Sequence, residues 1–268
     1  MSPRTPRERS ELLLLTLDAA REAAALVHTG WRKHPAVEHK GAVDLVTAFD
    51  RASEELLRSR LARETGIAVV GEEQGGVAAE GAGEATFYVD PIDGTTNFVH
   101  GHPFYCVSVG LFVGQEPVLG VVVAPAILTE WTGVVAERSA RRNDVPCAVS
   151  RVSLFEDALL ATGFPYDRNL TTDNNFDAFV AIKRRCQAVR RCGSAAIDLC
   201  LVADGTYDGY WERRLRPWDL AGGAAIVLAA GGRLTDYDGA RPDVSVGNTV
   251  ATNGAIHDAL LACLAATR

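Results

Sequence analysis

The sequence has no apolar run long enough to cross a membrane. Its longest apolar stretches are Val118–Leu128 and Ala224–Ala230, and both are shorter than the roughly 18 residues that a spanning helix needs. The leucines at 12–15 follow several arginines, but charged residues from Asp18 onward interrupt the run too early for a signal peptide. We therefore expect a cytoplasmic protein with no membrane partner.

Patterned cysteines and an excess of basic charge are also missing. The six cysteines form no C-x-x-C pair and keep no regular spacing, as is typical of reduced thiols and not of a disulfide framework or a zinc centre. The net charge is −7 at pH 7, which argues against a nucleic-acid-binding module that relies on phosphate attraction. An acidic protein that handles anionic substrates usually needs cations, so this balance favours a metal site.

Two common catalytic motifs are absent. The sequence contains neither a G-x-x-x-x-G-K-[ST] loop for ATP nor a G-x-S-x-G nucleophile elbow. A glycosidase would need two carboxylates but not the Gly-Thr-Thr turn described below. The chemistry must therefore be sought in other residues.

Hydrophobic content of 47% and charged content of 23% over 268 residues fit an ordinary globular protein. In the first half, apolar periodicity predicts helices over 10–31 and from about 44–47 to 65. Strands are predicted over 67–71, 86–89, 106–113, 118–123 and 130–135, with a hairpin turn at 114–117.

Past residue 147 the pattern changes to alternating helices and strands. Helices are predicted over 174–189, 194–203, 217–230 and 255–266, and a strand over 207–212. Ser194 is a plausible N-cap. We expect an α/β protein of two packed halves, 1–146 with most of the metal ligands and 147–268 with the substrate-side residues.

The most informative segment is Asp90-Pro91-Ile92-Asp93-Gly94-Thr95-Thr96-Asn97. It follows a predicted buried strand, so its two carboxylates lie at a strand end. A hard cation prefers oxygen ligands of this kind. A phosphate prefers the free backbone N–H groups of a helix start, which the Gly-Thr-Thr turn can supply. The segment therefore predicts that a cation and a phosphate meet here.

Three further segments complete the predicted site. The first holds Asp44 and Asp50, with Lys40 before them; the second is Gly71-Glu72-Glu73; the third is Trp218-Asp219 at a predicted helix start. Carboxylates that converge without a counter-charge repel one another and raise each other's pKa values. A divalent cation removes that repulsion. We predict that Glu73 is solvated and that Trp218 packs to position Asp219.

In these motifs and their order the chain resembles the inositol monophosphatase family, within the lithium-sensitive, magnesium-dependent sugar-phosphatase superfamily. The resemblance extends from about residue 30 to 239. It implies a layered α-β-α-β-α sandwich, a homodimer and a Mg²⁺-dependent phosphomonoesterase that lithium inhibits at the second metal site. Inositol 1-phosphate is the best single substrate prediction, hydrolysed by a metal-activated water.

The resemblance also implies roles for individual residues. Two to three Mg²⁺ ions are expected, the first held by Glu72, Asp90 and the carbonyl of Ile92, the second by Asp90, Asp93 and Asp219, and a weaker third beside Glu72. Thr95, paired with Asp50, would orient the water, so Glu72, Thr95 and Asp50 form the expected catalytic set. The residues expected on the phosphate and substrate side are Asp93, Gly94, Thr95, Gly193, Ser194, Ala195 and Glu212.

Some alternatives stay open at this point. Arg213, Arg214 and Arg216 form a basic cluster that is either a solvated strand end or a contact for a second phosphate or a carboxylate. Relatives hydrolyse histidinol phosphate, fructose 1,6-bisphosphate or adenosine 3′,5′-bisphosphate with the same metal core. A relative retained mainly for binding a macromolecular partner is a further alternative.

Overall fold

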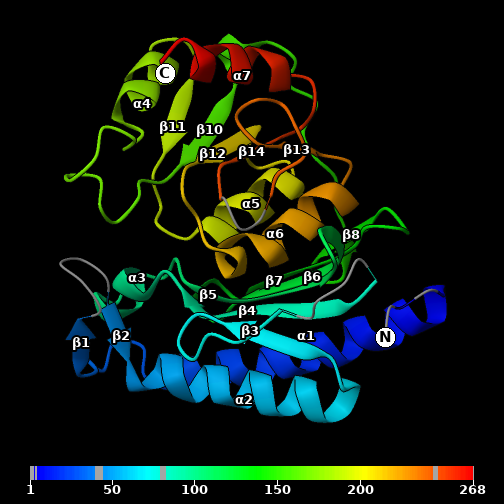
Figure 1. Cartoon of the computed structure of the whole chain (residues 1–268). Helices are drawn as coiled ribbons and strands as arrows, with labels where there is room; N and C mark the ends of the chain where they lie inside the picture. Colours follow the sequence, from blue (N-terminus) through cyan, green and yellow to red (C-terminus); the bar gives the residue numbers. More distant parts are fainter. Residues whose placement is uncertain (1–2, 4, 40–44, 79–82, 244–246, 268) are drawn as a thin grey trace.

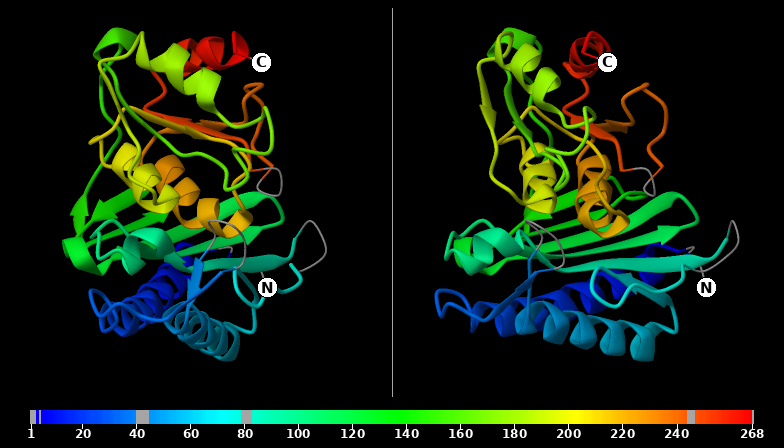
Figure 2. Two further views of the ribbon diagram at one scale, coloured as in Figure 1. Left: turned by 90° about the vertical axis from the view of Figure 1, so that its left-hand side faces the viewer. Right: turned by 60° about the vertical axis from the view of Figure 1, so that its left-hand side comes forward.

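Layers of helix and strand alternate from one end of the molecule to the other in the computed structural model (Figure 1). The structure describes residues 3, 5–39, 45–78, 83–243 and 247–267. Two long helices form the first layer, a large sheet the second, two helices the third, a smaller sheet the fourth and two helices the fifth. The turned views in Figure 2 show the same succession. The expected α-β-α-β-α sandwich is confirmed.

The first layer consists of helices α1 (Pro6–His28) and α2 (Ala48–Thr65). Both begin at a capping box, in which a threonine side chain and an acid three residues later satisfy first-turn N–H groups. Small apolar side chains of α1, from Ala19 to Val27, pack against the large sheet in the first core cluster. The buried face of α2 instead carries three polar residues that serve the site described below.

The large sheet is parallel at one edge and antiparallel elsewhere. In strand order it contains β3 (Ala68–Gly71), β4 (Ala85–Asp93), β5 (Cys106–Val113), β6 (Glu116–Ala124), β7 (Thr129–Val134), β8 (Ser139–Arg142) and β9 (Val145–Pro146). The β4–β5 register shifts between Asp90 and Asp93. Such an irregularity bends the strand end and re-aims its side chains. Beside it lie helix α3 (Thr95–Val99) and a small hairpin, β1 (Val37–His39) with β2 (Leu45–Thr47).

Helices α5 (Ala195–Ala203) and α6 (Pro217–Ala229) form the middle layer. Nearly every residue of both helices is buried, because a sheet covers them on each side. A helix that is apolar all round is stable only when it is enclosed in this way. Polar residues on these helices are therefore exceptions that need a reason, and Asp198 and Asp219 are two of them.

The second sheet has the order β11-β10-β12-β14-β13 and is mixed. Its strands are β10 (Leu159–Thr162), β11 (Ala188–Arg190), β12 (Gly209–Glu212), β13 (Arg233–Thr235) and β14 (Thr249–Thr252). Helices α4 (Phe176–Lys183) and α7 (His257–Ala265) cover its outer face (Figure 1). The chain crosses from the first sheet to the second after β9, which agrees with the predicted division at 146; that division into halves stays a prediction.

Most predicted elements are present with shifted ends, but two predictions are wrong in detail. The helix predicted over 174–189 ends at Lys183, and Ala188–Arg190 forms β11, because these residues pair in parallel with β10. The turn predicted at 114–117 is shorter, since Glu116 already pairs with Val113. The sequence reading also missed β10, β13 and β14. Lys40 and Asp44 lie outside the described residues.

Helix α6 of the middle layer packs unusually close to the large sheet. Gly120 on β6 faces the backbone of α6, and a Cβ built on it would lie 2.1 Å from the carbonyl oxygen of Gly222. Gly110 and Gly133 on the two neighbouring strands face Ala221 and Ile226 in the same way. The absence of side chains lets α6 lie directly on the sheet, which fixes the distance between the start of α6 and the end of β4.

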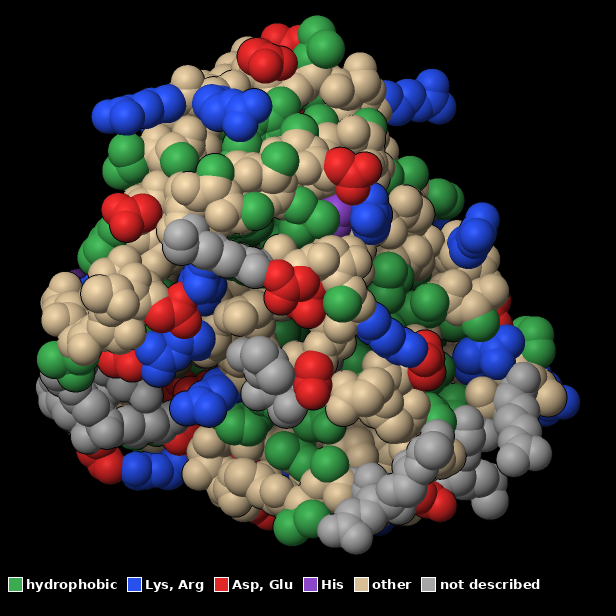
Figure 3. All heavy atoms as spheres, turned by 45° about the horizontal axis from the view of Figure 1, so that its top comes forward, with side chains coloured by type: hydrophobic (Ala, Val, Ile, Leu, Met, Phe, Trp, Pro, Cys, Tyr) green, Lys and Arg blue, Asp and Glu red, His purple; other side chains and the backbone are tan. Residues whose placement is uncertain are grey.

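Charged side chains of both signs are interspersed on the face drawn in Figure 3. Many form exposed ion pairs, such as Arg233 with Asp258 at 2.8 Å. No helix among the described residues is long and apolar enough to cross a membrane.

We expect Gly120→Ala to lower the free energy of unfolding by about 1–3 kcal/mol, because overpacking at a backbone contact forces the helix or the sheet to shift. Urea denaturation followed by circular dichroism measures the change. Gly83→Ala is the matched control, since a Cβ at Gly83 meets open space. Equal stability of the two variants would contradict the close approach.

Candidate active site

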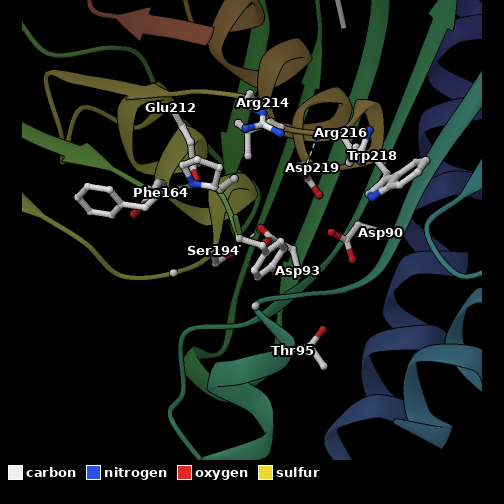
Figure 4. Close-up of a pocket in the computed structure, with 18 of the residues that line it drawn as sticks. Asp90, Asp93, Thr95, Phe164, Ser194, Glu212, Arg214, Arg216, Trp218 and Asp219 are labelled. Carbon is white, nitrogen blue, oxygen red and sulfur yellow. Dashed lines mark hydrogen bonds between the residues drawn. The ribbon is translucent and has the colours of Figure 1, made fainter. Parts of the chain in front are cut away.

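A cavity of about 660 Å³ lies where the end of β4, the start of α3, the start of α5 and the β12–α6 connection meet. All the residues predicted for the metal and substrate sites line it, except Asp50. Figure 4 shows the carboxylates of Asp90, Asp93 and Asp219 around one space, with Trp218 beside them. Trp218 therefore lines the cavity, where the sequence predicted only a packing residue.

Asp90 and Asp93 come from the bent end of β4. The Oδ1 atom of Asp90 accepts a hydrogen bond of 3.0 Å from the N–H of Ile92, which closes a tight turn within the motif. The Oδ2 atom of Asp93 accepts bonds from Ser194 Oγ at 2.7 Å and Ala196 N at 2.6 Å, at the start of α5. Each carboxylate thus uses one oxygen to hold its position, and the second oxygen is available to a ligand.

Asp219 and Glu72 approach from two other elements. Asp219 is in the first turn of α6, and its Oδ2 atom accepts a bond of 2.6 Å from the N–H of Arg216. Glu72 follows the last residue of β3 directly. Because β3 and β4 are parallel neighbours, their C-terminal ends share one edge of the sheet, which brings Glu72 to the same side as Asp90.

Burial and neighbouring carboxylates raise the affinity of Asp90 and Asp219 for protons. The pKa of Asp90 is well above its ordinary range, first because the side chain is buried and then because Glu72, Asp93 and Asp219 are close. Burial and Glu72 likewise raise the pKa of Asp219 well above normal. For Asp93, burial raises the pKa against the opposing bonds from Ser194 and Ala196. A bound cation would therefore stabilise the ionised form of these carboxylates.

The donor set fits a hard divalent cation. All of its donors are oxygens, from carboxylates and from the Ile92 carbonyl, and none is a thiol or an imidazole. Within the described residues, no group of three or more His, Cys, Asp or Glu side chains is arranged closely enough to hold a metal ion by itself. A cation that keeps several waters and takes few carboxylates does not need a closed cage. The residues therefore suit such a cation, bound together with water and substrate oxygens.

Thr95 and Asp50 form a connected pair at the start of α3. The Thr95 hydroxyl lies 3.1 Å from Asp50 Oδ1 and 2.9 Å from the Ile92 carbonyl oxygen, and it can donate its proton to either. Asp50 Oδ2 accepts bonds from the N–H and the hydroxyl of Thr47. Burial raises the pKa of Asp50, and these bonds oppose the shift. Asp50 lies outside the cavity lining and is connected to it through the Thr95 hydroxyl.

The helix α2 supports three segments of the site from one face. Asp50, Ser53 and Glu54 are fully buried, and the spacing of three and four residues puts them on one side of the helix. Ser53 Oγ donates to the carbonyl oxygen of Pro91 at 3.1 Å. The two carboxylate oxygens of Glu54 accept from the N–H groups of Glu73 and Gln74, at 2.6 and 2.8 Å. The sequence reading missed Ser53 and Glu54, although their spacing from Asp50 was visible.

The phosphate-facing corner has its backbone fixed by a glycine and an amide. Gly94 has φ = 93°, a conformation that side chains rarely adopt, and a Cβ there would meet the carbonyl oxygens of Phe104 and Gly193. The Asn97 amide donates to the carbonyl oxygens of Phe104 at 2.7 Å and Cys192 at 2.8 Å. Asn97 thus ties α3 to the loop before α5, a role that the sequence reading did not assign.

Glu212 closes the far wall of the cavity. It comes from the end of β12, is 8% exposed and accepts a hydrogen bond from the Tyr210 hydroxyl. Burial raises the pKa of Glu212 to about 7, and the Tyr210 bond and Arg191 oppose the shift. Ser194, as predicted, caps α5, accepting from the N–H of Ile197 at 3.3 Å. Ala195 and Gly193 complete this wall.

The arginine cluster is engaged with acids of the loop that precedes α4. Arg213 pairs with Asp173 and lies over the ring of Tyr237, and Arg214 pairs with Asp167 at 2.6 Å. All three clustered arginines line the cavity, as does Arg191, which the sequence reading did not select. They are therefore part of the cavity wall, although Arg214 and Arg216 are also exposed to solvent, and Arg213 and Arg214 already have anionic partners.

This five-layered fold, with a carboxylate-lined cavity beside a phosphate-sized helix start, has clear relatives among known proteins. The model of the inositol monophosphatase family matches residues 8–268. The chain belongs to the inositol monophosphatase family, and it is a phosphoric monoester hydrolase.

Individual relatives agree over nearly the full length. An inositol-1-monophosphatase from Synechocystis is 40% identical over 264 residues, covering 98% of this chain and 92% of the relative. The structure of an inositol monophosphatase from Anabaena has a TM-score of 0.87 and 37% identity, with 97% of each chain covered. The Nus factor SuhB from Pseudomonas aeruginosa is 37% identical over 258 residues, covering 93% of this chain and 94% of the relative.

The raised pKa of Glu212 makes stability depend on pH. The unfolded chain releases this proton near pH 4.5, whereas the folded protein keeps it until about pH 7. The folded state therefore binds more protons in this window, and stability falls as the pH rises through it. In EDTA we expect the wild type to lose about 3 kcal/mol more than Glu212→Gln between pH 4.5 and 7.5, measured by urea denaturation. If the free energy of unfolding changed with pH by the same amount in the wild type and in Glu212→Gln, this prediction would be contradicted.

Proposed function

We propose that the chain is a Mg²⁺-dependent phosphomonoesterase that hydrolyses a polyol or sugar phosphate, with inositol 1-phosphate as the preferred substrate. The observation that carries this proposal is the meeting of four carboxylates, from β3, β4 and α6, with the N-terminus of α3 in one cavity. The first group suits a cation and the second suits a phosphate. The wall formed by Ser194 and Glu212 leaves room for a hydroxylated leaving group.

Two to three Mg²⁺ ions are proposed for the site. Glu72, Asp90 and the Ile92 carbonyl would hold the first; Asp90, Asp93 and Asp219 would hold the second; and Glu72 would face a weaker third. When bound, magnesium lowers the pKa of an attacking water and neutralises charge on the ester oxygens. The hydrogen bonds already made by Asp90, Asp93 and Asp219 restrict their rotamers, so each presents its second oxygen in a fixed direction.

Thr95 is proposed to orient the water for in-line attack. Its hydroxyl can accept a proton from the water and pass its own to Asp50 Oδ1, which lies 3.1 Å away. Asp50 is held by both donors of Thr47, so it does not turn away. Little covalent help is required in phosphate-ester hydrolysis, and positioning supplies most of the rate gain. Glu72, Thr95 and Asp50 together form the proposed catalytic set.

The phosphate and the alcohol would occupy different ends of the cavity. First-turn N–H groups of a helix have no intrahelical acceptor, so those of Gly94 and Thr95 are suited to phosphate oxygens. Asp93, Gly193, Ser194 and Ala195 would border the ester oxygen. Glu212, on the far wall, would accept a hydrogen bond from a hydroxyl group of the leaving alcohol. Water is limited at that wall, because Ser194 and Glu212 are both nearly fully buried.

Several broader properties belong to the same proposal. Lithium is proposed to inhibit by competing at the second metal site. A homodimer, a cytoplasmic location and the absence of nucleic-acid and membrane partners are proposed as well. The net charge of −7 supports the absence of a nucleic-acid partner.

A second candidate function has one specific observation in its favour. The similarity to the Nus factor SuhB of Pseudomonas aeruginosa supports a role in binding a macromolecular partner, with phosphatase activity secondary. Histidinol phosphate, fructose 1,6-bisphosphate and adenosine 3′,5′-bisphosphate are the alternative substrates for the same scaffold. The complete carboxylate set favours catalysis over a purely binding role.

Asp93→Asn should lower kcat by at least about 1,000-fold, because the amide keeps the shape of the side chain and loses the charge that a metal needs. Phosphate release from inositol 1-phosphate with Mg²⁺ measures the effect. Removing this charge from a repulsive cluster should leave the metal-free protein folded, which circular dichroism checks. If the Asp93→Asn gene restored a deletion phenotype, the binding role would be favoured over catalysis.

We expect Mg²⁺-dependent phosphate release from inositol 1-phosphate to exceed that from fructose 1,6-bisphosphate, histidinol phosphate and adenosine 3′,5′-bisphosphate. Each substrate is assayed with Mg²⁺ and with excess EDTA. The physical reason is the wall of Ser194 and Glu212, where Glu212 would accept a hydrogen bond from a hydroxyl group of the alcohol, and the EDTA arm is the control. Activity that persists in EDTA would contradict the metal mechanism. A preference for another ester would identify that ester as the substrate in place of inositol 1-phosphate.

A further inference from the structure

One carboxylate of the cavity has no partner and no role so far. Asp198 is on α5 and lines the cavity, yet its side chain is only 2% exposed. Its Oδ1 atom is buried and accepts no hydrogen bond from any described residue. A buried carboxylate that lacks a hydrogen-bond donor is strongly unfavourable, and buried acids in folded proteins are normally paired. Its retention at the cavity wall therefore points to a donor that arrives with a ligand.

The position of Asp198 separates it from the residues that would hold a metal. It lies one helical turn beyond Ser194, whose hydroxyl and helix start are already occupied with Asp93. The backbone N–H of Asp198 donates to the Ser194 carbonyl oxygen at 3.0 Å, so the backbone is fixed and only the side chain is unsatisfied. Asp198 therefore lines the cavity on the α5 wall, which would face the alcohol, beyond the phosphate corner.

Two charged neighbours define the chemistry of this wall. Glu212 and Arg191 line the same cavity and both act electrostatically on Asp198, in opposite directions. Glu212 accepts from Tyr210 and so has one oxygen already engaged. The wall therefore offers two carboxylate acceptors and one guanidinium donor. A ring that carries several hydroxyl groups matches it, because each hydroxyl both donates and accepts.

A second phosphate group would find few free partners near this wall. Arg213 and Arg214 are already paired with Asp173 and Asp167, so a bisphosphate that used them would have to displace these acids. Arg191 and Arg216 also line the cavity, and Arg191 already acts electrostatically on Asp198 and Glu212. The wall therefore suits a hydroxylated leaving group better than a second phosphate.

We propose that Asp198 is a specificity-determining residue that accepts a hydrogen bond from a hydroxyl group of the leaving alcohol, and so selects polyol monophosphates. This inference rests on the proposed phosphatase function and names the substrate class for the same cavity. A site built around a buried acceptor rejects substrates that lack the matching donor, because the acceptor then stays unpaired. Asp198 thus acts on substrate choice, and the metal-binding carboxylates act on the reacting phosphate.

The test compares Asp198→Ala and Asp198→Asn with the wild type on inositol 1-phosphate and on phenyl phosphate, whose leaving group carries no spare hydroxyl. For Asp198→Ala we expect kcat/KM on inositol 1-phosphate to fall about 10- to 100-fold more than kcat/KM on phenyl phosphate, mainly through KM. Asp198→Asn keeps an acceptor oxygen and should recover part of the loss. Asp258→Asn, at an 85% exposed side chain, is the matched control.

A second measurement separates this role from a structural one. Because the buried Oδ1 atom of Asp198 has no donor to lose, we expect the melting temperature of Asp198→Asn to equal or exceed that of the wild type. A clear drop in melting temperature, or an equal loss on both substrates, would mean that Asp198 supports the fold or the metals, and would overturn the proposal.

Two further outcomes distinguish a failure of the proposed phosphatase function from a failure of the role inferred for Asp198. If the wild type releases no phosphate from inositol 1-phosphate in Mg²⁺, the proposed function fails before Asp198 is tested. If the wild type is active and Asp198→Ala shows an unchanged ratio between the two substrates, only the inference fails. Histidinol phosphate, included as a third substrate, tests an ammonium donor in place of a hydroxyl; a loss confined to it would overturn the polyol assignment.

Discussion

The direct contact of α6 with the large sheet is the constraint on which the rest of the site depends. Because Gly120 has no side chain, the backbone of α6 lies directly against β6. This contact fixes the distance between the first turn of α6 and the end of β4. Asp219 therefore faces Asp90 across one cavity, although 129 positions separate them in the sequence, between 90 and 219. A bulkier residue at this contact would separate the two halves of the proposed metal site.

Electrostatic repulsion is the opposing tendency within the same space. Burial and the neighbouring carboxylates raise the pKa values of Asp90 and Asp219, and a metal-free fold must keep these acids together through other interactions. The hydrogen bonds from the starts of α5 and α6 supply part of that support, and the buried polar face of α2 supplies another part. The fold thus holds in advance an arrangement that becomes favourable when a cation binds.

The sequence predicted the parts of the site that share a local motif. Asp90, Asp93, Thr95, Glu72 and Asp219 could be identified, since each belongs to a short segment with a characteristic order of residue types. Ser53, Glu54 and Asn97 could not be assigned, because their roles come from hydrogen bonds to segments that are distant in sequence. Likewise, the prediction of helix at residues 188 and 189 was wrong, since pairing with β10 overrides the local helical periodicity.

The cavity is divided chemically between its two ends, and this division separates catalysis from substrate choice. The corner of β4 and α3 carries the carboxylates and helix N–H groups that any phosphate ester would use, so this end cannot discriminate among esters. In the proposed function the wall of α5 and β12 would face the alcohol; there Asp198 and Glu212 are buried acidic side chains, and nearby acids pair with Arg213 and Arg214. Selection among substrates must therefore arise at this wall, and a change of one charge there can alter specificity without touching the reacting phosphate.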